Sequence, residues 1–110
     1  MKLIKNNETV ALERIGDGFN YVLEGVLEAG ATIFIKMPPV SANKRGINDI
    51  GWQCDGFDVE MYATLSKNPE NTVLWSEVED NYVVNKTVSA LKIVNKDKTS
   101  CNICIRVILN

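Results

Sequence analysis

The stretch that decides the fold is Asp58–Ser66, which reads DVEMYATLS. Apolar residues occupy every second position, at Val59, Met61, Ala63 and Leu65, and the positions between them hold polar residues or Tyr62. In an extended strand, successive side chains point to opposite faces, so these four apolar side chains would share one face. The stretch therefore predicts a β-strand with one buried and one solvent-facing side.

Seven further stretches have the same character and are separated by turn-forming Gly, Asn, Asp or Pro residues. They are residues 9–15, 19–28, 32–37, 51–54, 72–78, 89–94 and 101–109. Repeated short strands with turn signals between them are typical of sandwiches and small barrels. We predict an all-β fold, an antiparallel β-sandwich of about eight strands. Alternation cannot decide between Ig-like and jelly-roll strand order.

Length and composition are those of one globular domain covering residues 1–110. A chain of 110 residues can bury a little over ~60% of its unfolded surface, so it needs neither a disulfide nor a metal to fold. Hydrophobic residues make up 45% of the chain and charged residues 24%, as in ordinary soluble domains.

Charge and hydropathy exclude two classes of partner. Twelve basic and fourteen acidic residues give a net charge of -2, and no basic block is present to neutralise phosphates. We therefore expect no nucleic-acid binding. The first ten residues lack the apolar core of a secretory signal, and no apolar run is long enough to cross a bilayer. We expect a protein that folds in the cytosol and binds no membrane.

The CNIC sequence at Cys101 and Cys104 raises the question of a metal or redox site. Within a strand, residues three apart point to opposite faces, and a structural zinc needs four N or S ligands where this chain has three cysteines and no histidine. We expect no metal, no cofactor and no disulfide. Cys54 and Cys104 should be core residues, with Cys101 at the entrance of a strand.

Enzymatic activity is not expected. Without histidine the chain lacks the usual general base and the Ser–His and Cys–His nucleophile pairs. Carboxylates alone could act as acid and base, but a sandwich of this size has little material for a deep cleft. The carboxylates concerned are Asp55, Asp58, Glu60, Glu77, Glu79 and Asp80.

The aromatic residues allow a binding function instead. Trp52, Tyr62, Trp75 and Tyr82 could form a flat platform for sugars, and the acidic segment 68–85 could suit Ca²⁺. The simpler interpretation places both tryptophans in the core or at a sheet edge. A carbohydrate- or host-surface-binding module remains the alternative function.

One long segment, residues 37–49 (MPPVSANKRGIND), does not alternate. Loops of this length inside a compact domain are uncommon and often functional, although a simple crossover between sheets is the other interpretation. If the loop docks a partner, its contact residues are Pro38, Pro39, Asn43, Lys44 and Arg45.

The last stretch, CNICIRVIL, predicts a central strand. Apolar residues occupy both of its faces, which is typical of a strand covered on both sides. Arg106 should then be a rim residue paired with a carboxylate. Gly25, in the middle of another predicted strand, suggests a bend or bulge.

From Gly51 onward the chain resembles the small β-sandwich virion proteins of tailed bacteriophages, such as capsid decoration (auxiliary) proteins and related head or tail accessory proteins. The resemblance lies in GWQC entering a strand, ATLS leading into an Asn-Pro turn and Trp75, NKTVSALKIVN, and the terminal IRVILN. It implies a non-enzymatic viral structural protein without cofactors. The implied partner is the major capsid protein or another virion subunit, bound in many copies or as a homo-oligomer. The implied location is the virion, assembled in the host cytoplasm.

Overall fold

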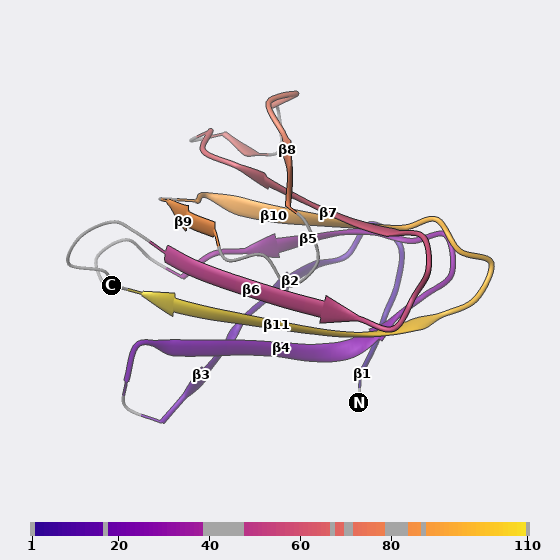
Figure 1. The fold of residues 1–110 in the computed structure, drawn as a ribbon, viewed down its shortest axis with the longest axis horizontal. Coiled ribbons are helices and arrows are strands. Elements are labelled where there is room, and N and C mark those ends of the chain that lie inside the picture. Colours follow the sequence, from indigo (N-terminus) through magenta and orange to yellow (C-terminus); the bar gives the residue numbers. More distant parts are fainter. Residues whose placement is uncertain are drawn as a thin grey trace.

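The computed structural model describes residues 2–16, 18–38, 48–66, 68–69, 72–78, 84–86 and 88–109, and these fold into two packed β-sheets (Figure 1). The six-stranded sheet contains β1 (Lys2–Ile4), β3 (Glu13–Ile15), β4 (Asn20–Leu27), β6 (Asn48–Cys54), β9 (Val84–Lys86) and β11 (Cys101–Leu109). The five-stranded sheet contains β2 (Thr9–Ala11), β5 (Thr32–Lys36), β7 (Val59–Thr64), β8 (Ser76–Val78) and β10 (Ala90–Asn95). The all-β prediction is confirmed, with eleven strands in the described residues where about eight were expected.

The strand order is β1-β4-β11-β6-β9 in the first sheet, with β3 also paired to β4, and β2-β5-β10-β7-β8 in the second. Most pairs are antiparallel, as predicted, but β1 and β2 pair in parallel with β4 and β5. In Figure 1, β7, β10 and β5 lie above β6, β11 and β4. The turns after β4, β6 and β10 each lead from one sheet to the other and meet at the right-hand end of that view.

The stretch that predicted the fold forms β7. Met61 and Ala63 are buried between the sheets, as their alternation requires, whereas Leu65 lies beyond the end of the strand and is 61% exposed. Thr64 is also buried although it belongs to the polar set. The periodicity thus identified the strand and its inner face but not the point where the strand ends.

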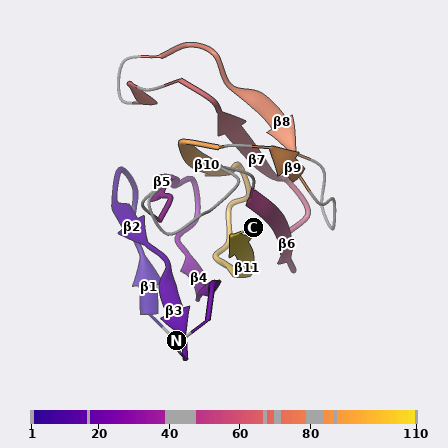
Figure 2. The ribbon, with the colours of Figure 1, turned by 90° about the vertical axis from the view of Figure 1, so that its left-hand side faces the viewer.

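The predicted strand 9–15 is divided at Leu12. Its first part, β2, pairs with β5, and its second part, β3, pairs with β4 in the other sheet. Because β1 also pairs with β4, the first fifteen residues pass from one sheet to the other and back. The strands β1, β2 and β3 of this segment together close one edge of the sandwich, and they lie on the left in Figure 2.

β11 is central, as predicted, with β4 and β6 on either side. Its burial alternates: Ile103, Ile105 and Val107 are buried, whereas Arg106 and Ile108 are exposed. The expectation that both faces are covered is therefore wrong. Only the inner face packs against the second sheet.

Gly25 produces no bulge, since the β4–β11 register runs without a break through Gly25 and Ile103. Instead it allows β1 to approach. A Cβ at this position would lie 2.9 Å from Ile4 Cδ1 and 3.1 Å from the Lys2 carbonyl oxygen. The glycine is required by close packing of β1 on β4.

Asn95, at the end of β10, is a fully buried polar residue that joins two of the turns. Its Nδ2 donates to the carbonyl oxygens of Leu27, Glu28 and Thr99 at 3.1–3.3 Å. Its Oδ1 accepts a hydrogen bond from the Asp97 amide at 3.0 Å. Asn95 therefore fixes the end of β4 against the loop between β10 and β11.

Candidate functional site

A row of side chains crosses the outer face of the five-stranded sheet. The strand registers place Phe34 opposite Lys92, Lys92 opposite Tyr62, and Tyr62 opposite Glu77. All four alternate along their strands with residues that point inward, so they face away from the core. The row therefore combines two aromatic rings, one cation and one carboxylate on neighbouring strands.

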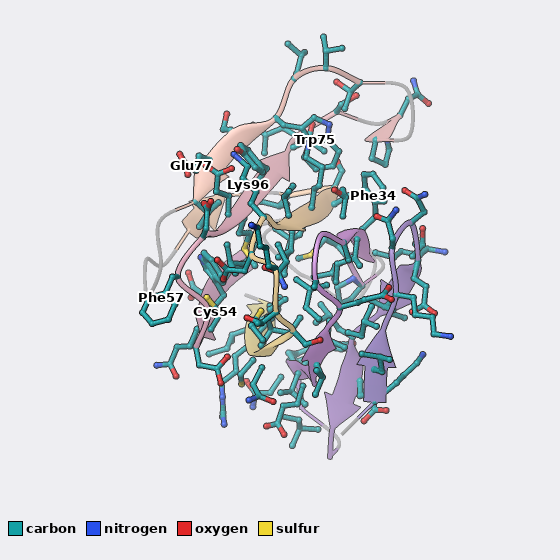
Figure 3. The ribbon with its side chains drawn as sticks, turned by 90° about the vertical axis from the view of Figure 1, so that its right-hand side faces the viewer. Phe34, Cys54, Phe57, Trp75, Glu77 and Lys96 are labelled. Carbon is teal, nitrogen blue, oxygen red and sulfur yellow. The ribbon has the colours of Figure 1, made fainter. Side chains whose placement is uncertain are left out.

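Trp75 lies over this row. Lys92 Nζ is 4.9 Å from the ring centroid of Trp75 and 4.9 Å from that of Tyr62, within range of a cation–π interaction with each. The rings of Phe34 and Trp75 are tilted by 53° with their centroids 6.2 Å apart. Trp75 Nε1 donates to the Thr72 carbonyl oxygen at 3.2 Å, which fixes the indole over the sheet (Figure 3).

The residues before Trp75 project into solvent. Val73 is 91% exposed and Leu74 is 74% exposed. Beside them is an open hollow of ≈ 440 Å³, whose walls include Phe34, Tyr62, Val73, Trp75 and Lys92. We call Phe34, Tyr62, Val73, Leu74, Trp75 and Lys92 the aromatic surface. Partly exposed Trp, Tyr and Phe rings beside exposed aliphatic side chains are typical of a binding surface.

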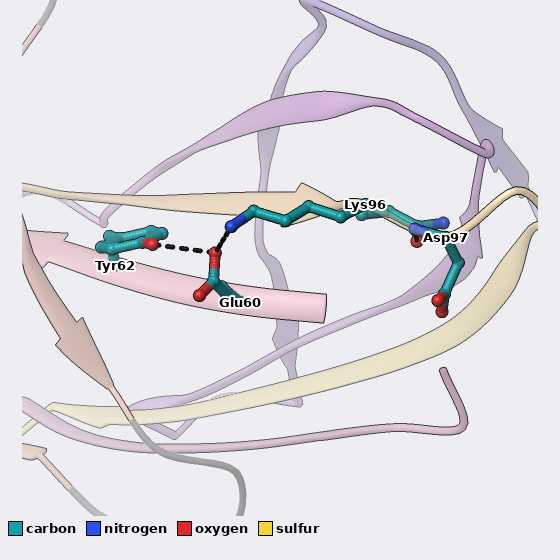
Figure 4. A network of polar contacts seen from close by, with 5 residues as sticks. Glu60, Tyr62, Lys96 and Asp97 are labelled. Atoms are coloured by element: carbon teal, nitrogen blue, oxygen red, sulfur yellow. Dashed lines mark hydrogen bonds and ion pairs between the residues drawn. The ribbon is translucent and has the colours of Figure 1, made fainter. Parts of the chain in front are cut away.

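Beside the aromatic surface, Glu60 accepts two polar contacts on one oxygen (Figure 4). Lys96 Nζ lies 2.6 Å from Glu60 Oε1, and the Tyr62 hydroxyl donates to the same oxygen at 3.0 Å. The pair fixes the orientation of Tyr62 at the edge of the hollow.

These contacts move three pKa values away from neutrality. The Lys96 ammonium and the Tyr62 hydroxyl lower the pKa of Glu60, while hydrogen bonding to Glu60 raises the pKa of Tyr62 and that of Lys96. Each group therefore keeps its ordinary protonation state around neutral pH. A general acid or base needs a pKa near the working pH, so this cluster suits recognition better than proton transfer.

The predicted docking loop is largely outside the described residues. Pro38 follows the buried Met37 and is half-buried. Pro39, Asn43, Lys44 and Arg45 lie outside the described part of the chain. Their role as partner contacts stays a prediction.

The sugar platform of four aromatic residues, which was the alternative to core or sheet-edge tryptophans, does not form. Trp52 is buried in the core with 3% of its surface exposed, whereas Tyr62 and Trp75 lie on the outer face of the opposite sheet. Tyr82 is outside the described residues. Sequence reasoning missed Phe34, although its alternation with the buried Ile33 and Ile35 could have placed it outward.

The three cysteines are present as thiols, but their places differ from those expected. Cys101, at the start of β11, is buried, whereas Cys104 is only half-buried on the opposite face with its sulfur 4.0 Å from Glu24 Oε1. Cys54 packs against the edge of the core. Cys101 and Cys104 point to opposite faces of β11, as their odd spacing predicted. The assignment of Cys104 to the core was wrong.

Some arrangements are absent from the described part of the chain. It contains no group of three or more His, Cys, Asp or Glu side chains placed to hold a metal ion. Among the same residues there is no helix with the length and hydropathy to cross a membrane. Nor does any described carboxylate form an ion pair with Arg106, which is exposed on β11.

Comparison with known proteins gives one informative likeness. No family model and no curated protein sequence matches this chain. Among solved structures, the fold is similar to that of Salmonella Typhimurium PliG, a periplasmic lysozyme inhibitor of g-type lysozyme. The TM-score is 0.60, the sequence identity is 8%, and the match covers 96% of this chain and 100% of PliG. The likeness therefore extends over the whole sandwich and concerns the fold.

This likeness corrects two expectations. The function of a phage capsid decoration protein is wrong, because the matching structure is a bacterial inhibitor and not a virion protein. The expected virion location is contradicted as well, since that protein is periplasmic. The resemblance to virion proteins rested on short apolar strands separated by polar turns. This pattern recurs in unrelated β-sandwiches, so it does not identify a function.

Proposed function

We propose that this chain is a non-catalytic protein-binding β-sandwich, and that its partner is a lysozyme-type enzyme that hydrolyses the bacterial cell wall. The observation that carries the proposal is the aromatic surface, in which the partly exposed Trp75 ring is held over Lys92 while Val73 and Leu74 project into solvent. The whole-chain likeness to a lysozyme inhibitor supports the class of partner.

The aromatic surface has the chemistry of a protein interface. Trp and Tyr are enriched among the residues that contribute most to binding, because they bury a large rigid area with few rotatable bonds. Here the Phe34 ring and the hydrogen bond to Thr72 hold Trp75, and the contact with Glu60 holds Tyr62. A partner would therefore meet side chains that are already ordered, which lowers the entropic cost of association.

The test is binding and inhibition of g-type lysozyme by the purified chain, with c-type lysozyme in parallel. Inhibition is followed by the clearing of bacterial cell walls, and affinity by calorimetry. We expect stoichiometric binding, and a loss of affinity of at least about 30-fold in the double variant Val73→Ser, Leu74→Ser. Both residues are exposed, so folding should be unaffected.

Ile108→Ala is the matched control, since Ile108 is an exposed apolar residue on the opposite sheet. If neither lysozyme binds, the class of partner is wrong. If lysozyme binds equally well to the double variant and to the wild type, the partner is right and the aromatic surface is not where it binds.

A further inference from the structure

At one end of the sandwich, Phe57 is fully exposed. It lies in the turn between β6 and β7, next to the loop between β10 and β11, and points away from the molecule in Figure 3. Exposure of a whole phenylalanine side chain to water is unfavourable and does nothing for the stability of the fold. Such a residue is a candidate contact for something outside the molecule.

The turn that carries Phe57 is held from both sides. Asp97 Oδ2 accepts hydrogen bonds from the Phe57 amide at 2.9 Å and from the Asp58 amide at 3.2 Å. Asp55 accepts from the Asn102 amide and from Asn102 Nδ2, each at 2.7 Å. In addition, the Lys96 amide donates to the Asp58 carbonyl oxygen at 2.8 Å. These contacts fix the backbone of the turn that presents the Phe57 ring.

Gly56 completes the arrangement. A Cβ there would lie 2.6 Å from Val59 Cγ2, 3.0 Å from Asp97 Oδ2 and 3.2 Å from Cys101 Cβ. The turn is thus packed directly against the core at Gly56, one residue before the exposed ring. This close packing leaves no room for the Phe57 side chain to fold back between Gly56 and its neighbours.

We propose that Phe57 is an anchor residue that inserts into an apolar pocket of the protein partner, and that Asp97 is the positioning residue that holds it ready. The partner pocket should have basic residues at its rim, because Asp55 and Asp58, which lie within two residues of Phe57 in the chain, are both exposed. This inference deepens the proposed function and rests on it. It adds a second contact, remote from Trp75: in Figure 3 Lys96 lies between the two.

The experiment measures the affinity of the full chain for g-type lysozyme. Phe57→Ala should weaken binding by at least about 30-fold, as for other anchor residues. It should leave the thermal midpoint unchanged, because the ring makes no contact with the core. Phe19→Ala, which truncates another exposed phenylalanine, is the matched control and should bind like the wild type.

The positioning role has its own test. Asp97→Ala keeps Phe57 but removes the acceptor of two amides, so it should weaken binding by about 10-fold and speed hydrogen exchange at the Phe57 and Asp58 amides. Asp97→Asn retains a carbonyl oxygen and should restore most of the affinity. Raising the salt concentration should weaken wild-type binding more than binding of Asp58→Asn, because the partner's rim is basic.

Each result bears on a different statement. If lysozyme binds the wild type and Phe57→Ala equally, the anchor is wrong and the proposed function stands. If lysozyme does not bind the wild type, both proposals fail together. Equal affinity of Asp97→Ala and the wild type, with faster exchange at the two amides, would show that the order of the turn is irrelevant to binding.

Discussion

Asp55 and Asn102, which are 47 residues apart in the chain, pair through both oxygens of the carboxylate. The Asn102 amide binds Oδ1 and its side-chain Nδ2 binds Oδ2, each at 2.7 Å, while the Asp55 amide donates back to the Asn102 carbonyl oxygen at 3.2 Å. Three hydrogen bonds thus join the end of β6 to the start of β11. They lie directly beside the turn that presents Phe57.

This pairing predicts a pH-dependent loss of stability. Hydrogen bonds from the Asn102 side chain and backbone lower the pKa of Asp55 below its ordinary value of 3.8. A carboxylate whose pKa is lower in the folded state stabilises the fold above its unfolded pKa, and this contribution is lost as the pH falls through the folded pKa.

We therefore expect Asp55→Asn to lower the thermal midpoint at pH 7, and the difference from the wild type to close in strongly acidic solution. Thermal unfolding followed by circular dichroism at several pH values measures both. Glu13→Gln, on the exposed strand β3, should behave like the wild type throughout. A difference that stays constant down to the acidic end would contradict a role for the Asp55 charge.

Because Asn95 is a fully buried polar residue, Asn95→Ala should be strongly destabilising. It removes the donor to three carbonyl oxygens and the acceptor of the Asp97 amide in a fully buried place. Buried groups without a partner are costly, so we expect a loss of about 2–4 kcal/mol in the free energy of unfolding. Urea denaturation is the measurement. Thr99→Ala keeps the carbonyl oxygen that Asn95 binds and should lose far less.

Gly25→Ala tests the close packing of β1. The new methyl group would meet Ile4 Cδ1 and the Lys2 carbonyl oxygen, so we expect a loss of about 1–3 kcal/mol. Ile4→Val in the same chain removes the nearest atom and should recover part of the loss.

Gly51 provides the matched control for this substitution. It also lies within a strand, β6, but a Cβ there would meet nothing within 4 Å. Gly51→Ala should therefore leave the stability unchanged or raise it slightly. If both alanine variants lose the same amount, the loss at position 25 is not due to contact with β1.

Cys101 should resist alkylation in the folded protein. Burial, with added repulsion from Cys54, Asp55 and Asp97, raises the pKa of its thiol to about 11. Only the thiolate reacts, and at pH 8 about one thiol in a thousand would be ionised. Iodoacetamide labelling followed by mass spectrometry should modify the half-exposed Cys104 first and Cys101 only above pH 10 or in denaturant. Equal rates at pH 8 in the native protein would contradict this placement.

The candidate site could be predicted only in part. The sequence identifies Tyr62 and Trp75 as candidates for binding. It also groups Trp52 with them, but Trp52 is buried in the core. Phe34 takes its place, because the β5–β10 and β10–β7 pairings bring residues 34, 92 and 62 into one row. Those pairings join residues far apart in the chain, so no local pattern reveals them. The same holds for Phe57, whose rigid turn depends on Asp97, forty residues away.

The sequence by itself determined most of the longer strands and the inner faces of β7 and β11, since the period of two is a local property that the pleated backbone imposes on every strand. It did not reveal the short strands β1 and β9, and it extended β8 back to residue 72. Met61, Ala63, Ile103, Ile105 and Val107 are buried as their alternation requires. Tertiary structure alone decided which sheet each strand joined, where residues 9–15 divide between the sheets, and why Gly25 is a glycine. All three features depend on the free energy of pairing between strands that are distant in the sequence. Because that free energy depends on the whole chain, no single stretch of sequence predicts it.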